Sequence, residues 1–351
     1  MKISKKINVA RRIVMRFFTR NIGTSKTSAK VLENPAQIKR ILICRPNGRL
    51  GNLLLITPLI KEVSSVFPNA QIDLFVKGGL MPVILENYPQ IGEVIVLPKK
   101  PFRYLFAYLK VWMTIKKIKY DMVLNVDKDS SSGRLAVEIS SAAYKFYGDA
   151  IEEDLIKNDD YDHIAKYPVY NFRDYLKVLG LKINTSNPVS AIDLKLSSEE
   201  IEKGREILNK KFDNQKKTIA IFTFATGDKC YSELWWTDFY GLLQRRYERD
   251  YNIIEILPTE NVSQIRFKAT SFYSKDIREI GAVIANTEIF VGADSGIMHL
   301  ANAVHIPVVG LFLVSNLKKY QPYGEGSIGI DININVNKNC YVLEMDRILA
   351  G

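Results

Sequence analysis

Cysteine and histidine are scarce in this sequence, and each occurs only three times in 351 residues. The cysteines, Cys44, Cys230 and Cys340, are odd in number, lie far apart and form no CxxC pair. This usage excludes a disulfide scaffold and fits a reducing, cytoplasmic compartment. The histidines show no metal-ligand spacing, so we expect neither a metal nor another cofactor.

Long apolar runs are also missing. No segment approaches the ~20 consecutive apolar residues that span a bilayer. Arg11, Arg12 and Arg16 interrupt what could have been the apolar core of a secretory signal. The hydrophobic share of 47% and the charged share of 25% are typical of a globular protein and exclude intrinsic disorder. At the usual ~100–200 residues per domain, the length predicts about two domains.

Acidic residues are absent from positions 1–32, which we call the N-terminal arm. Nine of the 49 Lys and Arg residues lie there, namely Lys2, Lys5, Lys6, Arg11, Arg12, Arg16, Arg20, Lys26 and Lys30. Residues 33–351 therefore carry 40 basic and 38 acidic residues, so most of the formal net charge of +11 comes from the arm. Net charge of this kind bears on what a protein binds rather than on its fold.

Residues 7–20 of the arm predict an amphipathic helix. At about 100° per residue, its apolar side chains share one face, and Lys5, Arg12, Arg16 and Arg20 fall on the opposite face. Such a helix suits the surface of an anionic membrane, which we expect as its partner. A solvated tail and a helix docked on its own domain are the plainer alternatives. No aromatic and basic binding module follows the arm, so we expect no nucleic-acid partner.

From residue 40 onward, apolar runs alternate with amphipathic stretches, the pattern of βαβ units with a parallel sheet. We expect strands at 40–44, 71–76, 93–97, 121–126, 218–224, 252–257, 288–292 and 307–313. We expect helices at 52–67, 81–88, 102–118, 235–247, 277–286 and 295–304. One more helix, ending near Lys211, follows a capping box formed by Ser197 and Glu200.

The series divides into two Rossmann-like halves of an α/β protein, joined near the polar stretch 181–194. The predicted domains are the arm at 1–32, a first domain at 33–188 and a second at 189–351. Ligands of such sheets bind at the carboxyl ends of the strands. The cleft between two facing domains is then the expected site.

The segment RPNGRLGNLLLITPL (45–59) follows a predicted strand and opens a helix. Gly48 and Gly51 permit a tight loop and a close backbone approach. The N–H groups of a helix start, with Arg45 and Arg49 nearby, suit an anionic or hydroxyl-rich ligand. The segment is not GxGxxG and no acidic residue follows at dinucleotide spacing, which disfavours a nicotinamide enzyme. A purely structural glycine turn is the alternative.

The segment EIFVGADSGIMHLANAVHIPVVGLF (288–312) predicts a strand that runs directly into a helix. Ser295 or Asp294 can cap this helix, and the amides around Gly296 can hold a diphosphate. Because a carboxylate repels phosphate, Asp294 either holds sugar hydroxyls or only caps the helix. His299 lies one turn into the helix, where a lone histidine is more often packed than catalytic.

The segment FATGDKCYSELWW (224–236) follows another predicted strand and contains Thr226 and Lys229. Lys229 could neutralise a leaving diphosphate without a metal, or it could be a solvated loop lysine. Glu260 follows the strand at 252–257 at the same sheet edge. A carboxylate there could accept hydrogen bonds from ribose hydroxyls.

These three segments, in this order, resemble glycosyltransferase family 9, the lipopolysaccharide heptosyltransferases, over about residues 40–325. VGADSGIMHLANAVHIPVVGLF is similar to the family's Asp-Ser/Thr-Gly-x-x-His-Leu segment. RLGNLLLITPL is similar to its Gly-Asp loop and Leu-rich helix, and YDMVLNVDKDSSSG (120–133) to its Tyr-Asp strand. The resemblance implies a GT-B fold, with two Rossmann-like domains facing a central cleft.

The resemblance also implies an inverting transfer of a heptose from a nucleotide diphosphate, such as ADP-heptose, to a lipid-linked saccharide such as a lipopolysaccharide core. The enzyme would be cytoplasmic and peripheral on the inner face of the cytoplasmic membrane. The first domain, with the loop at 45–51, would bind the acceptor, and the second would bind the nucleotide sugar.

The donor contacts are carried over by position. Asp294, Ser295 and Gly296 would contact the donor sugar and diphosphate, with His299 and Thr226 among the donor-binding residues. Lys229 would stabilise the leaving group, and Glu260 would hold the nucleotide ribose. The Lys229 match is loose, because the family's tryptophan follows closely and here comes at Trp235.

One departure concerns the catalytic base. The family's base is the Asp of the Gly-Asp loop, and this sequence has Asn52 there. An amide cannot take a proton from an acceptor hydroxyl, although Asn52 could still orient the acceptor. Asp127 and Asp129 are the candidate replacements, or the acceptor could bring its own base. The alternative is a catalytically silent nucleotide-sugar-binding protein.

Overall fold

The computed structural model describes Gly23 and residues 30–98, 104–149, 158–185, 187–212, 214–334 and 337–350. The helix expected at 7–20 lies outside these residues and stays a prediction. The chain divides into two compact units. The first comprises the chain up to Gly48, Pro58–Pro82 and Tyr88–Ser190, and the second comprises Arg49–Thr57, Val83–Asn87 and Ala191–Gly351. No helix within the described residues is long and apolar enough to cross a membrane.

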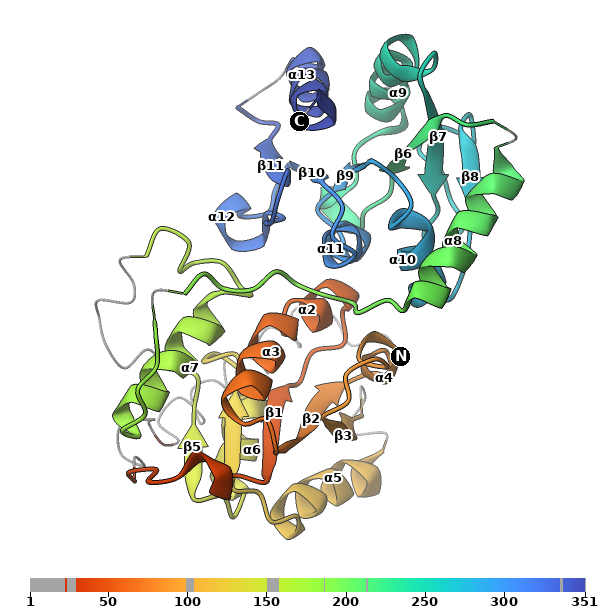
Figure 1. Ribbon diagram of the computed structural model, residues 1–351. Coiled ribbons are helices and arrows are strands. Elements are labelled where there is room, and N and C mark those ends of the chain that lie inside the picture. The colour runs from red at the N-terminus through yellow and green to blue at the C-terminus, as the bar shows by residue number, and fades with distance from the viewer. Residues whose placement is uncertain are drawn as a thin grey trace. The chain divides into compact units, whose positions relative to one another are not determined.

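The first unit contains a five-stranded parallel sheet with the order β3-β2-β1-β4-β5 (Figure 1). Its strands are β1 (Arg40–Arg45), β2 (Gln71–Lys77), β3 (Ile91–Leu97), β4 (Met122–Asn125) and β5 (Tyr144–Phe146). β1 and β4 are buried along almost their whole length, as parallel strands covered on both faces are. The sequence predicted the first four of these strands and missed β5, which has only three residues.

Helices cover the sheet of the first unit. They are η1 (Pro35–Gln37), α3 (Thr57–Val66), α4 (Met81–Ile84), α5 (Leu105–Lys117), α6 (Ser131–Ile139) and α7 (Tyr167–Val178). α5 and α6 share one apolar cluster with the strands, which includes Phe75, Ile115 and Val137. Arg173 of α7 donates to both carboxylate oxygens of Glu62 in α3, at 2.7 and 2.9 Å.

The single helix predicted at 52–67 is wrong at its centre, because the structure has two helices, α2 (Leu50–Leu54) and α3. Pro58 has no N–H to donate to the carbonyl of Leu54. The Thr57 hydroxyl donates to that carbonyl instead, at 2.8 Å. The break separates the units, since α2 belongs to the second unit and the chain from Pro58 belongs to the first.

The second unit contains a six-stranded parallel sheet with the order β11-β10-β9-β6-β7-β8. Its strands are β6 (Lys217–Phe222), β7 (Tyr251–Ile256), β8 (Thr270–Phe272), β9 (Ile289–Ala293), β10 (Val308–Phe312) and β11 (Ile328–Asp331). Counted from β6, this is the doubly wound order 3-2-1-4-5-6. The prediction of two Rossmann-like halves is therefore confirmed, and β8 and β11 are edge strands that the sequence did not indicate.

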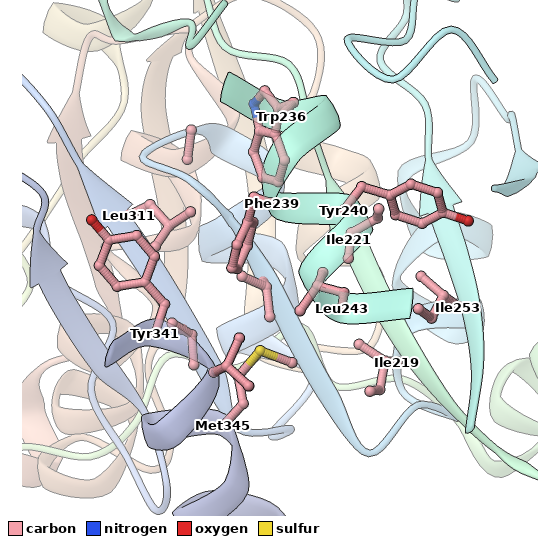
Figure 2. Packing of buried hydrophobic residues seen from close by; sticks show 14 of the residues in the cluster. Ile219, Ile221, Trp236, Phe239, Tyr240, Leu243, Ile253, Leu311, Tyr341 and Met345 are labelled. Carbon is pink, nitrogen blue, oxygen red and sulfur yellow. The ribbon is translucent and has the colours of Figure 1, made fainter. Parts of the chain in front are cut away.

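The helices of the second unit include α8 (Ser198–Lys211), α9 (Glu233–Tyr247), α10 (Ile277–Ile284), α11 (Gly296–Ala303), α12 (Leu317–Tyr320) and α13 (Lys338–Ala350). α9 and α13 pack together on one face of the sheet, around Trp236, Phe239, Tyr341 and Met345 (Figure 2). The predicted capping box of α8 is present in both directions. The core thus packs against β6, β7 and β9, whose carboxyl ends carry the predicted donor-binding residues.

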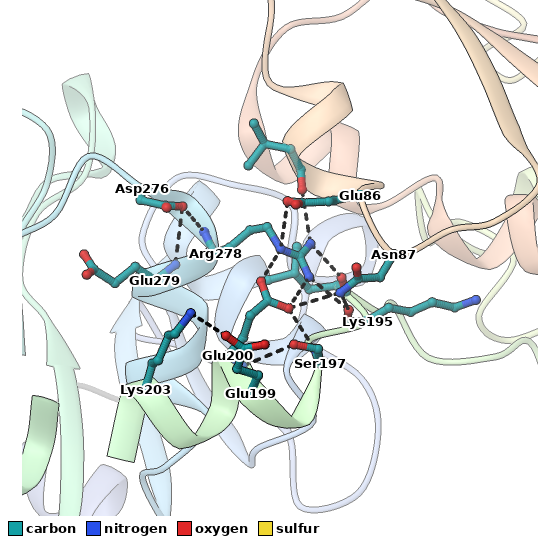
Figure 3. Close-up of polar contacts among 12 residues, drawn as sticks. Glu86, Asn87, Lys195, Ser197, Glu199, Glu200, Lys203, Asp276, Arg278 and Glu279 are labelled. Atoms are coloured by element: carbon teal, nitrogen blue, oxygen red, sulfur yellow. Dashed lines mark hydrogen bonds and ion pairs between the residues drawn. The ribbon is translucent and has the colours of Figure 1, made fainter. Parts of the chain in front are cut away.

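A buried arginine ties Val83–Asn87 into the second unit (Figure 3). Arg278 is 4% exposed and donates to the carbonyls of Val83 and Lys195, at 3.1 and 3.0 Å, and to the carboxylate of Glu200. The Asn87 amide donates to the same Lys195 carbonyl at 2.7 Å. The hydrogen bond from Arg278 is the main reason why the pKa of Glu200 falls to about 2.

Several of the described residues before β1 contact the first unit, and Gly23 and Leu32 are examples. The carbonyl of Gly23 accepts a 2.7 Å hydrogen bond from the guanidinium of Arg134. Leu32 is only 2% exposed, and its N–H donates to the carbonyl of Leu179 at 2.8 Å. The packing of the first unit therefore reaches back into the predicted arm as far as Gly23.

Candidate functional site

In each sheet the strand order reverses beside the first strand of the unit, β1 or β6. Ligands of doubly wound sheets bind at the carboxyl ends of the strands at such a point. In the second unit the reversal lies between β6 and β9, and an ion pair joins the loops that follow them. The Lys229 ammonium contacts the Asp294 carboxylate, whose side chain is 6% exposed against 37% for Lys229. The structure thus brings two predicted site residues together at the expected place.

Lys229 has a second neighbour. Its ammonium lies 5.7 Å from the centre of the ring of Tyr320, which belongs to α12, the helix that follows β10. A cation over an aromatic face is attracted by the ring quadrupole. The ammonium is therefore held at the sheet edge while remaining partly accessible to a ligand.

The start of α11 resolves which residue caps the helix. The Ser295 hydroxyl accepts from the N–H of Met298 at 3.2 Å, so Ser295 is the N-cap and Asp294 is left for Lys229. Gly296 begins the helix, and a Cβ atom there would lie 3.1 Å from the Cβ of Leu50. The first turn of α11 thus lies close against α2, and its dipole favours an anion at this end.

His299 lies beneath this loop. Its Nε2 atom is 3.9 Å from Asp294, while its Nδ1 atom is buried and has no hydrogen-bond partner among the described residues. Burial lowers the pKa of His299, and the nearby Lys229 charge lowers it further, against the opposing effect of Asp294. The ring is therefore neutral at physiological pH and packs against Gly51, where a Cβ would meet His299 at 2.7 Å.

The remaining predicted donor-binding residues lie in exposed loops of the second unit. Thr226 precedes the short helix η3 (Gly227–Lys229), after β6. Glu260 follows β7 and accepts from the Thr259 hydroxyl at 3.0 Å. Both lie at the carboxyl ends of their strands, the edge of the sheet that holds Lys229 and Asp294.

A residue that sequence reasoning missed is Glu255, which is fully buried in β7. Its two carboxylate oxygens accept from the hydroxyls of Thr223, at 2.6 Å, and Ser263, at 2.7 Å. Burial raises the pKa of Glu255, although both hydrogen bonds oppose the shift. The contacts tie the loop that carries Glu260 to the end of β6. The available indication was one acidic residue inside an otherwise apolar strand.

In the first unit, the reversal of strand order lies between β1 and β4 and is also occupied by an ion pair. Arg45, 3% exposed, donates to Asp127 at 3.1 Å, and the other oxygen of Asp127 accepts from the Asp129 N–H at 3.1 Å. Arg45 is thus already paired with a carboxylate. Asp129 is exposed.

Tyr167, at the start of α7, is a second residue that the sequence did not suggest. Burial raises the pKa of Tyr167, the negative charge of Asp127 raises it further, and Arg45 opposes both. The phenol is therefore protonated at physiological pH and lies within the electrostatic reach of the carboxylates. It can act as a hydrogen-bond donor there.

The glycine loop at 45–51 is divided between the units. A Cβ on Gly48 would lie 2.3 Å from the carbonyl of Lys77, so this position requires glycine for a close backbone approach within the first unit. Arg49 is the N-cap of α2, and Asn52 is a half-buried residue of that helix. α2 packs against α11, which sets Asn52 in the same unit as Lys229 and Asp294.

The described residues contain no group of three or more His, Cys, Asp or Glu side chains arranged to hold a metal ion. In each unit, the side chains at the carboxyl ends of the strands offer their own acid–base and charge chemistry. It consists of an ammonium beside a helix N-terminus, a neutral histidine and several carboxylates.

The chain resembles known glycosyltransferases along most of its length. The family model of glycosyltransferase family 9 (heptosyltransferase) matches residues 108–343. A lipopolysaccharide heptosyltransferase 3 of Escherichia coli is 21% identical over 299 residues, which cover 79% of this chain and 85% of that protein. The corresponding protein of strain K12 is 23% identical over 301 residues, covering 79% and 84%.

Solved structures of the same family share the fold. A family 9 glycosyltransferase from Veillonella parvula has a TM-score of 0.70 at 18% identity, covering 92% of this chain and 99% of that one. The ADP-heptose lipopolysaccharide heptosyltransferase II of E. coli has a TM-score of 0.65 at 14% identity, covering 89% and 98%. The predicted GT-B fold and glycosyltransferase class are confirmed, and the chain belongs to glycosyltransferase family 9.

Proposed function

We propose that this glycosyltransferase moves a heptose, with inversion, from ADP-heptose to a lipid-linked saccharide such as a lipopolysaccharide core. The observation that carries the proposal is the Lys229–Asp294 ion pair in front of α11, at the reversal of strand order in the second sheet. Its relatives support the choice of donor, because a structure of an E. coli heptosyltransferase, WaaC, with a TM-score of 0.60, contains ADP-2-deoxy-2-fluoro heptose.

In the proposed complex, the diphosphate lies at the N-terminus of α11 and takes Lys229 as its counter-ion. Asp294 is then released to accept hydrogen bonds from hydroxyls of the sugar. Thr226, Ser295 and Gly296 line the diphosphate side, and Glu260 holds the ribose. The neutral His299 ring keeps the base of the loop dry without adding a charge.

The reaction is a displacement at the anomeric carbon of the sugar. An acceptor hydroxyl oxygen forms the new bond from the face opposite the diphosphate, and the bond from that carbon to the diphosphate oxygen breaks. The hydroxyl proton passes to a base, and the negative charge collects on the leaving diphosphate. Lys229 and the α11 dipole stabilise that charge, so the step needs no metal ion.

The base is the open part of the proposal, since Asn52 occupies the family's position. We propose Asp127 or Asp129, which follow β4 in the first unit. Arg45 holds Asp127 at 3.1 Å, and Asp129 is exposed. The Tyr167 hydroxyl, which lies within the electrostatic reach of both carboxylates, is suited to bind an acceptor oxygen.

Substitution of the carboxylates tests the base. We expect Asp127→Asn or Asp129→Asn to lower the rate of transfer by about 10²–10⁴-fold, the usual contribution of a general base. Asn52→Ala should cost much less, and donor-induced thermal stabilisation should survive in all three variants. A rate of transfer that neither Asp substitution lowers would favour an acceptor that brings its own base.

A panel of nucleotide sugars tests the donor, because a ligand that binds only the folded state raises the melting temperature. We expect the largest rise with ADP-heptose, and release of ADP in the presence of a lipopolysaccharide-core acceptor and EDTA. Binding without turnover would instead identify a catalytically silent nucleotide-sugar-binding protein. No response to any nucleotide sugar would overturn the proposal.

We also propose that the protein works at the cytoplasmic face of the inner membrane, held there by the basic arm. The arm's excess of Lys and Arg over acidic residues supports an anionic surface as its partner. Nucleic acid is the rival polyanion. Tight RNA or DNA binding that falls steeply with salt would favour that rival.

A further inference from the structure

The outward face of α5 is apolar and, among the residues that the structure describes, it is left exposed. The exposed fractions are 90% for Phe106, 55% for Leu105, 54% for Met113 and 49% for Leu109. Single exposed apolar side chains are common on proteins, but a contiguous group of large ones marks an interaction surface.

The opposite side of α5 is firmly packed, so its orientation on the first unit is fixed. Ile115 is fully buried in the cluster that α5 shares with α6 and the sheet. The Trp112 ring lies 5.5 Å from the ring of Phe75 in β2, edge to face. The outer side chains are therefore exposed while α5 is packed in place on the first unit.

The outer side chains form one stripe. At about 100° per residue, Leu105, Leu109, Met113 and Phe106 fall within an arc of about 100°. Lys116 lies within the same arc toward the end of the helix, and Lys110 and Lys117 border it. We call these four apolar and three lysine side chains the α5 face.

The stretch of sequence that contains α5 carries charge of one sign. Between Glu93 and Asp121 the sequence contains seven Lys and Arg residues and no acidic residue. The near neutrality of residues 33–351 is thus an average that hides this segment. A protein partner would match the apolar stripe, but apolar side chains together with three lysines match an anionic lipid surface more completely.

We propose that α5 is an interfacial helix that lies flat on an anionic bilayer. Phe106, Leu105, Leu109 and Met113 enter the boundary between headgroups and acyl chains, and the three lysines bind lipid phosphates. This inference adds a second membrane contact to the one proposed for the arm. It rests on the proposed function only for the reason why the protein would need that contact. It gives the first unit, which would bind the lipid-linked acceptor, its own contact with the surface that bears the acceptor.

The test uses the full-length chain and phosphatidylcholine vesicles with or without phosphatidylglycerol, separated by sedimentation. The apolar variant carries Phe106→Ser, Leu109→Ser and Met113→Ser, and the charge variant carries Lys110→Gln, Lys116→Gln and Lys117→Gln. We expect each to weaken binding to the anionic vesicles by at least about tenfold. Leu343→Ser on α13, 60% exposed in the second unit, is the matched control and should bind as the unchanged chain does.

Two further measurements keep the outcomes separate. ADP-heptose should stabilise all variants equally, because the changes lie on the outer surface of the first unit. If ADP-heptose does not stabilise the unchanged chain, the proposed function is refuted. The vesicle measurements then still decide whether α5 binds lipid. Unchanged vesicle binding by both α5 variants would overturn the inference. The inference would also be overturned if the unchanged chain formed a dimer and the apolar variant were a monomer, since a second copy would then cover α5.

Discussion

The Lys229 side chain is partly exposed, whereas the Asp294 side chain is nearly buried. Substitution of Lys229 therefore affects both the accessible positive charge and the buried carboxylate. Lys229→Ala takes away the charge that we propose stabilises the leaving diphosphate, and it takes from the nearly buried Asp294 carboxylate its lysine partner. We expect the rate of transfer to fall by about 10²–10³-fold, the usual effect of losing one transition-state charge stabiliser. The measurement is the rate of nucleoside diphosphate release.

Lys319 provides a matched control for that substitution. Its ammonium lies 5.6 Å from the same Tyr320 ring, but it forms no part of the pair with Asp294. Lys319→Ala should leave the rate within about twofold of the unchanged chain, as surface substitutions do. Equal losses in both variants would show that the ring, and not the pair, matters.

His299 should make stability depend on pH in mild acid. Its folded-state pKa lies below the ordinary value of about 6.5, chiefly because the ring is buried. The unfolded chain therefore binds the proton more readily, and stability falls as the pH drops below about 6.5, with a slope of up to ~1.4 kcal/mol per pH unit. Above that pH this group contributes no slope.

Urea unfolding at a series of pH values measures this effect, and His299→Gln should remove it. Because the chain has only three histidines, their ring signals in NMR spectra can be followed separately. A His299 ring that titrates at its ordinary pKa would contradict the prediction.

The sequence indicates candidate site residues where the chemistry is local and misses residues whose partners are distant in the chain. Asp294, Ser295 and Gly296 are recognisable because a strand end and a helix start lie next to each other in the sequence. Glu255 was missed because its partners, Thr223 and Ser263, belong to other loops and only the folded sheet brings them to it. An acidic residue inside a strand has no sequence pattern that distinguishes burial from exposure.

At the scale of elements, the contact between α2 and α11 depends on a missing side chain. A Cβ atom on Gly51 would lie 2.7 Å from the His299 ring, closer than real Cβ contacts. Gly51→Ala should destabilise the fold by about 1–3 kcal/mol, as overpacking does. Gly79→Ala is the control, since no atom lies within 4 Å of a Cβ there.

Chemical unfolding of the two variants measures the difference. Gly79→Ala should change the free energy of unfolding by no more than about 1 kcal/mol, and in the stabilising direction, because alanine restricts the unfolded chain. Equal stability of the two variants would mean that α2 can move away from α11 without loss.

The helices and strands that are most buried were the easiest to predict, because burial requires a recognisable pattern of apolar residues. Strands such as β1 and β9 are continuous apolar runs because both faces of a parallel sheet are covered. Edge strands β8 and β11 are short and partly exposed, so their sequences lack that pattern. The break between α2 and α3 was missed because the apolar periodicity continues through it, although Pro58 was visible.

At the scale of the whole molecule, a deletion that ends at residue 22 removes most of the arm and spares the contacts of the described residues. Such a deletion keeps the Gly23 carbonyl that Arg134 binds and the buried Leu32. It removes seven of the nine basic residues of the arm. We expect affinity for anionic vesicles to fall by at least about tenfold, because each basic residue near such a surface contributes ~1 kcal/mol.

The same deletion should leave stabilisation by ADP-heptose unchanged. Vesicles of phosphatidylcholine alone provide the control, since they offer the arm no charge to bind. Loss of the response to the nucleotide sugar would show that the arm is part of the folded body.

The assignment of Arg49–Thr57 and Val83–Asn87 to the second unit has a consequence during translation. These segments leave the ribosome long before Ala191–Gly351 has been made. At ~5–20 residues per second, α2 waits roughly ten seconds to a minute for α11. During that interval Leu50 has no Gly296 to pack against, and the carbonyl of Val83 has no Arg278. The nascent first unit can form its sheet early, whereas the second unit is complete only when Ala191–Gly351 has emerged.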